Sequence, residues 1–222
     1  MSLVSYDALS EPWQHCVDLA WEAYCAGSLP IAAVVIDETG AIVATGRNRI
    51  GDKETAHPYI SNHALAHAEL NALLVLDESK VNPRACTLYT TTEPCPLCMG
   101  AIRMAGVRKF HYACRDPWAG CAAMTETVPY VGAKVRGIPP QSDVLEACLA
   151  ALIVEDYLHA RLENPAFFDA WKVALPVGFE VGSRLAETGE LRTLAKNKAE
   201  ACEMFGVVSS LVADLSSTKT AS

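Results

Sequence analysis

The sequence predicts an α/β fold in which helices cover a mixed β-sheet. Between residues 13 and 158, segments with helical spacing alternate with short segments rich in apolar and β-branched residues. Alternation of this kind favours a layered α/β architecture. The chain has 222 residues, of which 51% are hydrophobic, so it is long and apolar enough to bury a substantial core.

A helix followed by a β-hairpin is expected at the start of the layered region. Residues 13–26 form the expected helix, because one side carries Trp13, Cys16, Val17, Ala20 and Tyr24. The short apolar run 30–36 and the segment 41–46 are separated by the turn sequence DETG. Two such runs around a tight acidic and glycine-containing turn predict two paired antiparallel strands.

A second helix is expected over residues 63–76, with Asn62 as its N-cap. Its predicted buried stripe contains Leu65, Ala72, Leu73 and Leu76. The segment 85–92 is rich in threonine and predicts a third strand.

A further helix and strand follow in the same alternating order. Residues 95–105 predict a helix that ends at Gly106, and residues 107–113 predict the next strand. The segment 133–138 gives a weaker strand signal. Together these segments provide enough strands for one mixed sheet covered by helices.

The last part of the chain is predicted to be helical. Residues 142–158 indicate an amphipathic helix capped by Ser142, and Asn164-Pro165 marks a break. Apolar residues then recur every three or four positions to about residue 216, with interruptions at Gly189 and Gly206, and the final SSTKTAS is expected to be disordered. We therefore expect two parts, a domain over residues 1–162 and a helical C-terminal extension over residues 163–222.

Charge and composition restrict the expected partners. The net charge is −8, and the basic residues form only scattered pairs such as Arg47/Arg49 and Arg108/Lys109. Proteins that grip phosphate backbones usually show a basic footprint, so nucleic acid is the less favoured partner. No apolar run reaches the ~18 residues that span a bilayer, so no membrane partner is expected. Nine cysteines without a secretory signal predict reduced thiols and a cytoplasmic protein.

Two short motifs carry the candidate chemistry, His-Ala-Glu at residues 67–69 and Pro-Cys-Pro-Leu-Cys at 94–98. Cys95 and Cys98 share one face at a helix start, where the helix dipole favours thiolates. With His67 they would give zinc three ligands and leave one position open for water. Glu69 would then lie beside that water, as a general acid/base requires.

Each motif alone has an ordinary explanation. A lone His-x-Glu is common on solvated helix faces, and a lone Cys-x-x-Cys occurs in structural zinc half-sites and redox pairs. His63 is more typical of a cap or surface histidine than of a fourth ligand. The two motifs in this order, however, match the H-x-E and P-C-x-x-C signature of zinc deaminases. Their combination therefore favours a catalytic zinc site.

At these motifs the chain resembles the cytidine/deoxycytidylate deaminase superfamily, in the branch that contains tRNA adenosine deaminases and guanine deaminases. HAELNAL and TTEPCPLCMGAI resemble its two zinc motifs, and LPIAAVV and ATGRNR resemble its first two strands. RDPWAGC resembles a loop of the tRNA adenosine deaminase group. The likeness extends over about residues 13–158, is vague between residues 122 and 133, and is lost beyond Glu163.

The resemblance implies a three-layer α/β/α fold on a mixed five-stranded sheet, a homodimer, and Zn²⁺ as cofactor. It implies that the zinc ligands are His67, Cys95 and Cys98, and that Glu69 moves protons from an activated water to the ring and to the leaving amine. The residues it places at the substrate are Asn48, Ala68, Asp116 and Trp118. Trp118 could stack on a base, although such residues are as often packing anchors.

Three functions remain open from the sequence. The first is a zinc-dependent hydrolytic deaminase that releases ammonia from a free nucleobase, a nucleoside or a related amino-heterocycle. The second is a tRNA adenosine deaminase, which RDPWAGC supports and the acidic charge opposes. The third is a zinc-bearing binding module without turnover, for which Glu69 would have no use.

Overall fold

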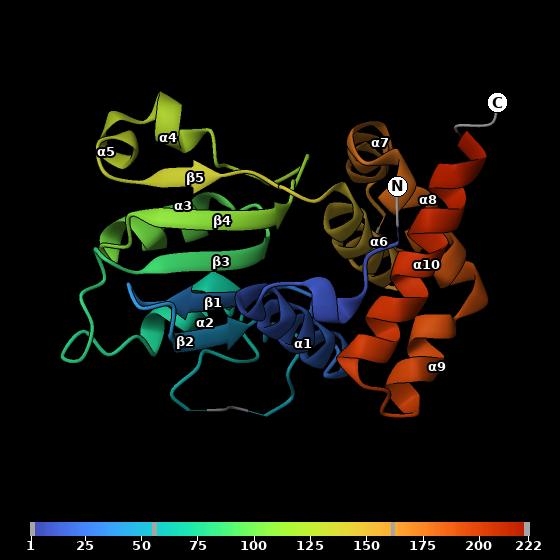
Figure 1. Cartoon of the computed structure of the whole chain (residues 1–222), viewed down its shortest axis with the longest axis horizontal. Coiled ribbons are helices and arrows are strands. Elements are labelled where there is room, and N and C mark those ends of the chain that lie inside the picture. Colours follow the sequence, from blue (N-terminus) through green and yellow to red (C-terminus); the bar gives the residue numbers. More distant parts are fainter. Residues whose placement is uncertain (1–2, 55–56, 161–162, 220–222) are drawn as a thin grey trace.

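A computed structural model describes residues 3–54, 57–160 and 163–219 and shows one mixed five-stranded sheet with helices on both faces (Figure 1). The spatial strand order is β2-β1-β3-β4-β5. Strand β1 pairs antiparallel with β2 and β3, whereas β3-β4 and β4-β5 are parallel. The strands are β1 Ala32–Ile36, β2 Ile42–Arg47, β3 Thr87–Thr92, β4 Lys109–Cys114 and β5 Arg136–Ile138. The expected hairpin and mixed sheet are confirmed, and only the end of segment 133–138 is a strand.

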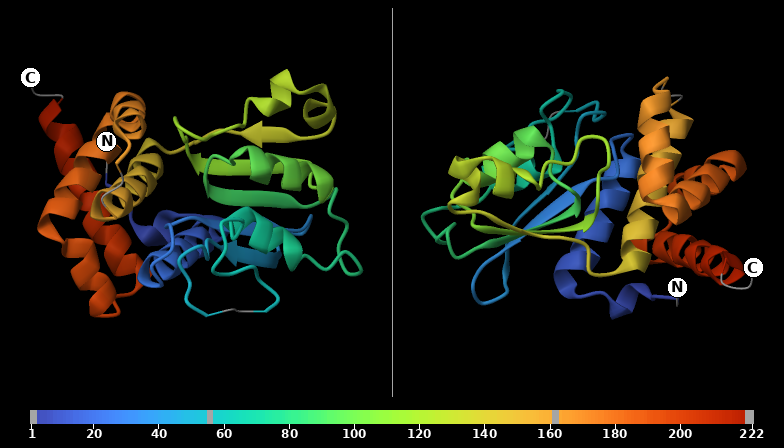
Figure 2. Two further views of the ribbon diagram at one scale, coloured as in Figure 1. Left: turned by 180° about the vertical axis from the view of Figure 1, so that it is seen from behind. Right: turned by 90° about the horizontal axis from the view of Figure 1, so that it is seen from above.

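Helices from both halves of the layered region cover the sheet. Helices α2 and α3 share a core with the side chains of Val35, Leu88 and Phe110, and α1 packs on the other side of the sheet (Figure 2). Two short helices, α4 and α5, occupy the region between β4 and β5, for which no helix was predicted. The bounds are 3-10 helix η1 Tyr6–Ala8, α1 Glu11–Cys25, α2 Ala68–Leu74, α3 Pro96–Met104, α4 Met124–Thr127, α5 Pro129–Gly132 and α6 Asp143–His159.

The start of α2 differs from the expectation. The helix begins at Ala68 with His67 as N-cap, whereas Asn62 has a positive φ of 51° and caps no helix. The backbone of Arg49 explains the difference, because it accepts from the N–H of Asn62 and donates to the carbonyl of Ala66. These bonds hold residues 62–66 along the end of β2, and Leu65 is 45% exposed instead of buried.

Helix α6 is buried around its whole circumference and is not amphipathic. Every residue from Val144 to Glu155 is buried. The predicted cap is confirmed, since the Ser142 hydroxyl accepts from the N–H of Leu145 at 3.2 Å. The absence of a solvent face means that α6 is covered by the rest of the protein on one side and by the extension on the other (Figure 2).

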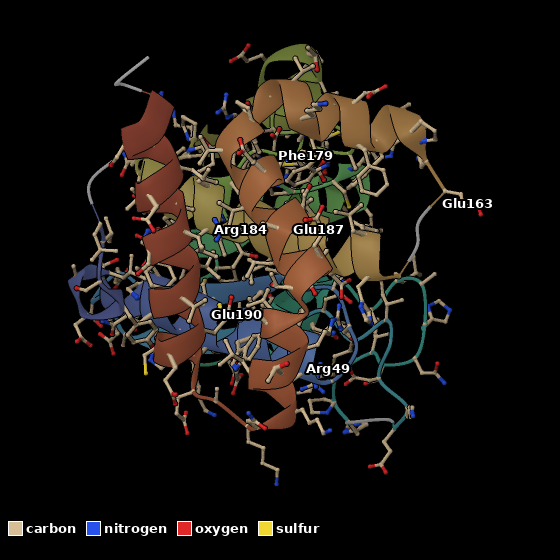
Figure 3. The ribbon with its side chains drawn as sticks, turned by 90° about the vertical axis from the view of Figure 1, so that its right-hand side faces the viewer. Arg49, Glu163, Phe179, Arg184, Glu187 and Glu190 are labelled. Carbon is tan, nitrogen blue, oxygen red and sulfur yellow. The ribbon has the colours of Figure 1, made fainter. Side chains whose placement is uncertain are left out.

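The C-terminal extension is a group of four helices packed on α6 and α1 (Figure 3), namely α7 Pro165–Ala174, α8 Pro176–Thr188, α9 Glu190–Lys196 and α10 Ala201–Lys219. Gly189 adopts the left-handed conformation and separates α8 from α9, as expected. Gly206 does not interrupt α10, because one helical glycine costs only about 1 kcal/mol, which burial of neighbours such as Phe205 and Val208 can offset.

The ends of the extension also differ from the sequence prediction. Helix α10 continues to Lys219, so residues 216–219 are helical where disorder was expected, and residues 220–222 lie outside the described part. Residues 161–162, at the proposed boundary between the two parts, also lie outside it. In the described part, no helix has both the length and the apolar character needed to cross a bilayer.

Two glycines on one face of α8 allow its backbone to approach α6 closely. A Cβ atom at Gly178 would lie 2.6 Å from the Cβ of Ala150, and one at Gly182 would lie 2.7 Å from the carbonyl oxygen of Ala151. Both distances are far below van der Waals contact, and the second obstacle is backbone. The interface between α6 and α8 therefore depends on the absence of side chains at these two positions.

Polar contacts of Arg192 also hold the extension against α6 and α1. The Arg192 guanidinium of α9 contacts Glu155 at 3.3 Å and Asp156 at 2.8 Å, and it lies over the ring of Tyr24 from α1. Glu155 is fully buried, so removing its cationic partner would leave a desolvated carboxylate. Near the start of α10, the Trp21 indole donates to the carbonyl of Ala199 at 2.8 Å.

We expect Gly182→Ala to lower the free energy of unfolding by about 1–3 kcal/mol, as overpacking of a filled core does. The added methyl would meet the Ala151 carbonyl and the Val154 side chain. Chemical denaturation followed by circular dichroism would measure the change. The matched control is Gly206→Ala in α10, where an added Cβ meets nothing within 4 Å and helix propensity should add about 0.5–1 kcal/mol. Equal stability of the two variants would contradict the close-approach interpretation.

Candidate active site

The two sequence motifs meet at one end of the sheet, where the starts of α2 and α3 converge. His67 is the N-cap residue of α2, and Cys95, which follows β3, is the N-cap residue of α3. Cys98 lies in the first turn of α3. Each motif therefore places its metal-binding side chain at a helix start, where free N–H groups favour negative charge.

The three side chains fit a tetrahedral zinc ion. The Nδ1 atom of His67 lies 3.6 Å from the Sγ of Cys95 and 3.5 Å from the Sγ of Cys98. Zinc at about 2.05 Å from nitrogen and about 2.3 Å from sulfur, with tetrahedral angles, would separate these atoms by roughly 3.5 Å. All three ligand atoms lie within 4.8 Å of one another. The nitrogen and sulfur donor set is also the one that zinc prefers.

The protein groups around Cys95 by themselves favour the thiolate form of its side chain. Hydrogen bonds from Cys98 and His67 lower the pKa of Cys95 to about 4, in spite of partial burial. The contact with Cys95 and burial raise the pKa of Cys98, which favours a proton on that sulfur. A bound cation would displace that proton, because coordinated thiols are deprotonated.

Glu69 lies beside the three ligands. Its Oε2 atom is 3.2 Å from the Sγ of Cys98, and the residue is only 4% exposed. Burial raises the pKa of its carboxyl group above the ordinary value. Because His67 is the N-cap of α2, its imidazole extends from the helix start while Glu69 follows in the first turn, and both face one cavity. A carboxyl group with a raised pKa next to a zinc-water position is suited to accept and return protons.

Two contacts fix the start of α2 against β2. A Cβ atom at Gly46 would lie 2.4 Å from the Ala68 carbonyl oxygen and 2.3 Å from the Ala72 nitrogen, so only glycine permits this approach. The fully buried Asn71 side chain donates to the carbonyls of Arg47 and Ile60 and accepts from the Ile60 N–H. Together these contacts set the position of His67 and Glu69 relative to the sheet.

A cavity of about 270 Å³ lies in front of the metal-binding group. Of the predicted substrate-contacting residues, Asn48, Ala68 and Asp116 line it. The Asn48 side-chain oxygen accepts from the Ile50 N–H, which fixes the orientation of the amide. Trp118 lies apart from the lining residues, is 51% exposed and packs edge-on against Phe167 of α7. The full lining is Leu29, Ile31, Asn48, Ile50, His67, Ala68, Glu69, Thr92, Glu93, Cys95, Cys98, Asp116, Ala119 and Tyr157.

Comparison with known proteins agrees with this geometry. Residues 8–114 match the cytidine and deoxycytidylate deaminase zinc-binding region. A guanine deaminase of Bacillus subtilis is 34% identical over 122 residues, which is 53% of this chain and 71% of that protein. The chain belongs to the cytidine and deoxycytidylate deaminase family.

Other proteins are similar to this chain over different lengths. A tRNA-specific adenosine deaminase of Bacillus subtilis is 36% identical over 101 residues, which is 43% of this chain and 55% of that protein. The chain spans 20% of a tRNA(Ile)-lysidine synthase of Deinococcus deserti and 54% of a probable cytosine deaminase of Schizosaccharomyces pombe. A solved guanine deaminase from Nitrosomonas europaea shares the fold, with a TM-score of 0.53 and 23% identity over 71% of this chain and 87% of that one.

Several lining residues were not anticipated from the sequence. Tyr157 comes from the end of α6, and Glu93 accepts from the backbone N–H groups of Asp116 and Ala122 and so shapes the loop after β4. Glu93 adjoins the cysteine motif, but Tyr157 belongs to a helix with no sequence signature. His63 is exposed, and its ring accepts from the Leu65 N–H, as a local cap would.

Two arginines near the cavity are engaged in ion pairs. Arg47 is 6% exposed and contacts Asp52 at 2.8 Å and Glu22 at 2.7 Å. Arg49 contacts Asp52 at 3.0 Å and lies over the ring of Tyr59. Their charges are therefore matched within the protein, and Arg49 lies in the loop that follows β2 (Figure 3).

We expect Cys95→Ser and Cys98→Ser to lose bound zinc, because serine replaces a thiolate with a much weaker ligand. Elemental analysis of purified protein would give the metal content, and wild type should carry about one zinc per chain. Cys121→Ser is the control, since the Cys121 backbone N–H donates to the Pro94 carbonyl next to Cys95 but its thiol lies outside the ligand group. Full zinc occupancy in either motif variant would show that the ligands are assigned wrongly.

Proposed function

We propose that the chain is a zinc-dependent hydrolytic deaminase of a small amino-heterocycle, either a free nucleobase, a nucleoside or a related ring. The observation that carries this proposal is the cavity of about 270 Å³, which brings the metal-binding group, Glu69, Asn48 and Asp116 together. A site for a small ligand is typically concave, largely apolar and equipped with a few polar groups that fix orientation. This cavity has those properties at the scale of one ring system.

The cavity wall can hold a flat ring with polar edges. Leu29, Ile31 and Ile50 provide apolar surface for the ring faces. Asn48 offers an amide, and Asp116 offers a carboxylate oxygen beyond the one that accepts from the N–H groups of Trp118 and Ala119. The amide can donate and the carboxylate can accept, so the pair can recognise the hydrogen-bonding edge of an aminated heterocycle.

Zinc held by His67, Cys95 and Cys98 would supply an activated water at the open end of the site. Glu69 accepts a proton from the attacking water and delivers it to a ring nitrogen next to the amino-bearing carbon. Glu69 then takes the second proton from the hydroxyl group formed on that carbon and gives it to the amine. The C–N bond breaks, ammonia departs, and the ring keeps the oxygen as a carbonyl. The raised pKa of the buried Glu69 carboxyl group supports this role, because a group that both takes and gives a proton works best near the operating pH.

The runner-up is a tRNA adenosine deaminase. The loop RDPWAGC and the similarity to a tRNA-specific adenosine deaminase of Bacillus subtilis favour it. The pairing of Arg47 and Arg49 with acidic partners weighs against it, since each phosphate contact requires an available cation. A zinc-bearing module without turnover is less favoured, because burying the Glu69 carboxyl group is costly and the Cys98 thiol that it contacts is itself a proposed zinc ligand.

A homodimer in a reducing compartment such as the cytoplasm completes the proposal. Exposed apolar side chains gather over the helices on one face of the sheet, namely Leu74, Leu97, Met104 and Tyr130. The Tyr130 hydroxyl contacts the sulfur of Met104, so two of them are contiguous. A patch of this kind is typical of a protein interface. The nine free cysteines support a reducing environment.

We expect the purified protein to sediment at twice the chain mass of 23.8 kDa at micromolar concentration, because dimerisation would cover this patch. Met104→Glu should shift the equilibrium toward the monomer by placing a charge in the interface. Val173→Glu is the control, because Val173 is also strongly exposed but lies in the extension. A wild-type protein that sediments as a monomer over this concentration range would contradict the dimer.

The decisive experiment for the activity is an ammonia-release screen of nucleobases, nucleosides and aminated heterocycles, with one tRNA included. At least one small compound should be turned over by the zinc-loaded protein. Glu69→Gln should retain zinc and lose about 10²–10⁴-fold in kcat, which is the usual contribution of a general acid/base.

Two results would overturn these assignments. Adenosine-to-inosine conversion in tRNA, with sub-micromolar tRNA binding at about 0.15 M salt and no turnover of any small compound, would favour the runner-up instead. A Glu69→Gln variant with near-normal kcat would exclude the proton-shuttle role, and one that lost zinc would indicate that Glu69 is a ligand.

A further inference from the structure

The extension reaches the candidate active site through one aromatic side chain, Phe167 of α7. The Phe167 ring lies 4.6 Å from the ring of Tyr157 and 6.4 Å from that of Trp118, both in edge-to-face contact. Tyr157 lines the cavity, and Trp118 belongs to the loop that carries Asp116. Phe167 therefore touches two separate parts of the site, the end of α6 and the loop after β4.

Phe167 is itself held firmly. It is 4% exposed, and its ring packs on the buried Trp171 one turn further along α7. The Asn164 side chain caps α7 by accepting from the Phe167 N–H at 3.1 Å. The close packing of α8 on α6 and the bonds from Arg192 to Glu155 and Asp156 fix the extension on the same helix that carries Tyr157.

The loop after β4 transmits this contact to Asp116. One carboxylate oxygen of Asp116 accepts from the N–H groups of Trp118 and Ala119, both at 2.9 Å. The Trp118 backbone and the Asp116 carboxylate thus belong to one turn, and the position of the first fixes the orientation of the second. A side chain that holds the Trp118 ring also restrains the carboxylate that faces the cavity.

We propose that Phe167 is a positioning residue through which the C-terminal extension sets the selectivity of the active site. By holding Tyr157 and the Asp116 turn together, it keeps the outer wall of the cavity closed around a single ring and excludes a ring that carries a sugar. This proposal rests on the small-heterocycle function proposed above. It assigns to the extension a role in substrate choice in addition to packing.

The predicted effect follows from the size of the side chain. Phe167→Leu retains an apolar contact with Trp171 but loses the edge-to-face contacts with Tyr157 and Trp118. Both walls can then move, so the turn at Asp116 should open more often. A looser wall weakens the binding of a free base and admits a nucleoside, so the ratio of the two activities should change.

The experiment compares wild type, Phe167→Leu and Phe167→Ala with the control Phe179→Leu. Phe179 is an aromatic residue of α8 in the same extension that packs on Phe168 (Figure 3). The first measurement is amide hydrogen–deuterium exchange of residues 116–120 in the zinc-loaded protein without substrate. Phe167→Leu should increase exchange there by about threefold or more, since local opening governs the rate, while Phe179→Leu should match wild type.

The second measurement is ammonia release from guanine, adenine and cytosine and from their ribonucleosides. For the base that wild type deaminates, Phe167→Leu should raise KM by about tenfold with a smaller change in kcat, the pattern of lost binding. The preference for that base over its nucleoside should fall by about tenfold. Zinc content should be unchanged, which separates this effect from damage to the metal site.

Each outcome decides the proposal. Loop exchange and base preference that are the same in Phe167→Leu and Phe179→Leu would overturn it. If Phe167→Ala unfolds, the leucine variant still carries the test. If wild type prefers a nucleoside to its base, the proposed role in substrate choice fails while the proposed function stands. If wild type turns over no compound in the wider screen of nucleobases, nucleosides and aminated heterocycles, both fail. The exchange measurement would still report whether Phe167 holds the loop.

Discussion

The spacing of three ligand atoms is the constraint on which the rest of the structure depends. A tetrahedral zinc ion requires the His67 nitrogen and the two cysteine sulfurs to lie within about 4 Å of one another. The two motifs lie on different helices and can satisfy this only if both helices begin at one point. The β-sheet supplies that point, because β2 supports α2 at Gly46 and β3 leads directly into α3. The cavity lies beside the place where the two helices begin. The same arrangement of helix starts therefore positions the zinc ligands and leaves space for a substrate.

Charge near the site is matched internally. Asp52 bonds to Arg47, Arg49 and Ser28 at once, so one buried carboxylate organises the chain between β2 and the turn at Gly51. Burying these groups is favourable only because each has several partners. The result is a rigid side of the cavity with no spare positive charge from these two arginines. For this reason Arg47 and Arg49 do not count as part of a basic surface that could bind nucleic acid.

Much of the fold and the metal-binding group could be predicted from the sequence because they depend on local patterns. The turn of the hairpin formed by β1 and β2 is predicted by the sequence DETG. Helix α3 is predicted by a proline at its start and by Gly106 after its end. The start of α2 could not be predicted, because the backbone of Arg49, some thirteen residues earlier, holds residues 62–66 in another conformation. Tyr157 and Phe167 also escaped prediction, since their position at the site depends on how α6 and α7 pack, which no short-range pattern records. Burial all round α6 likewise depends on the extension that covers it.

The burial of α6 has a consequence for the order in which the protein can become functional during synthesis. All three residues that fit zinc, and Glu69 with them, precede α6 in the chain. When α6 leaves the ribosome, the side of its apolar surface that the extension covers has no partner until the following helices are made. At about 5–20 residues per second, the roughly 60 remaining residues take several seconds to appear. During this interval the nascent chain already contains all the proposed catalytic and metal-binding residues, but one side of α6 is still exposed. A chaperone that covered this one helix for several seconds would be sufficient to protect it.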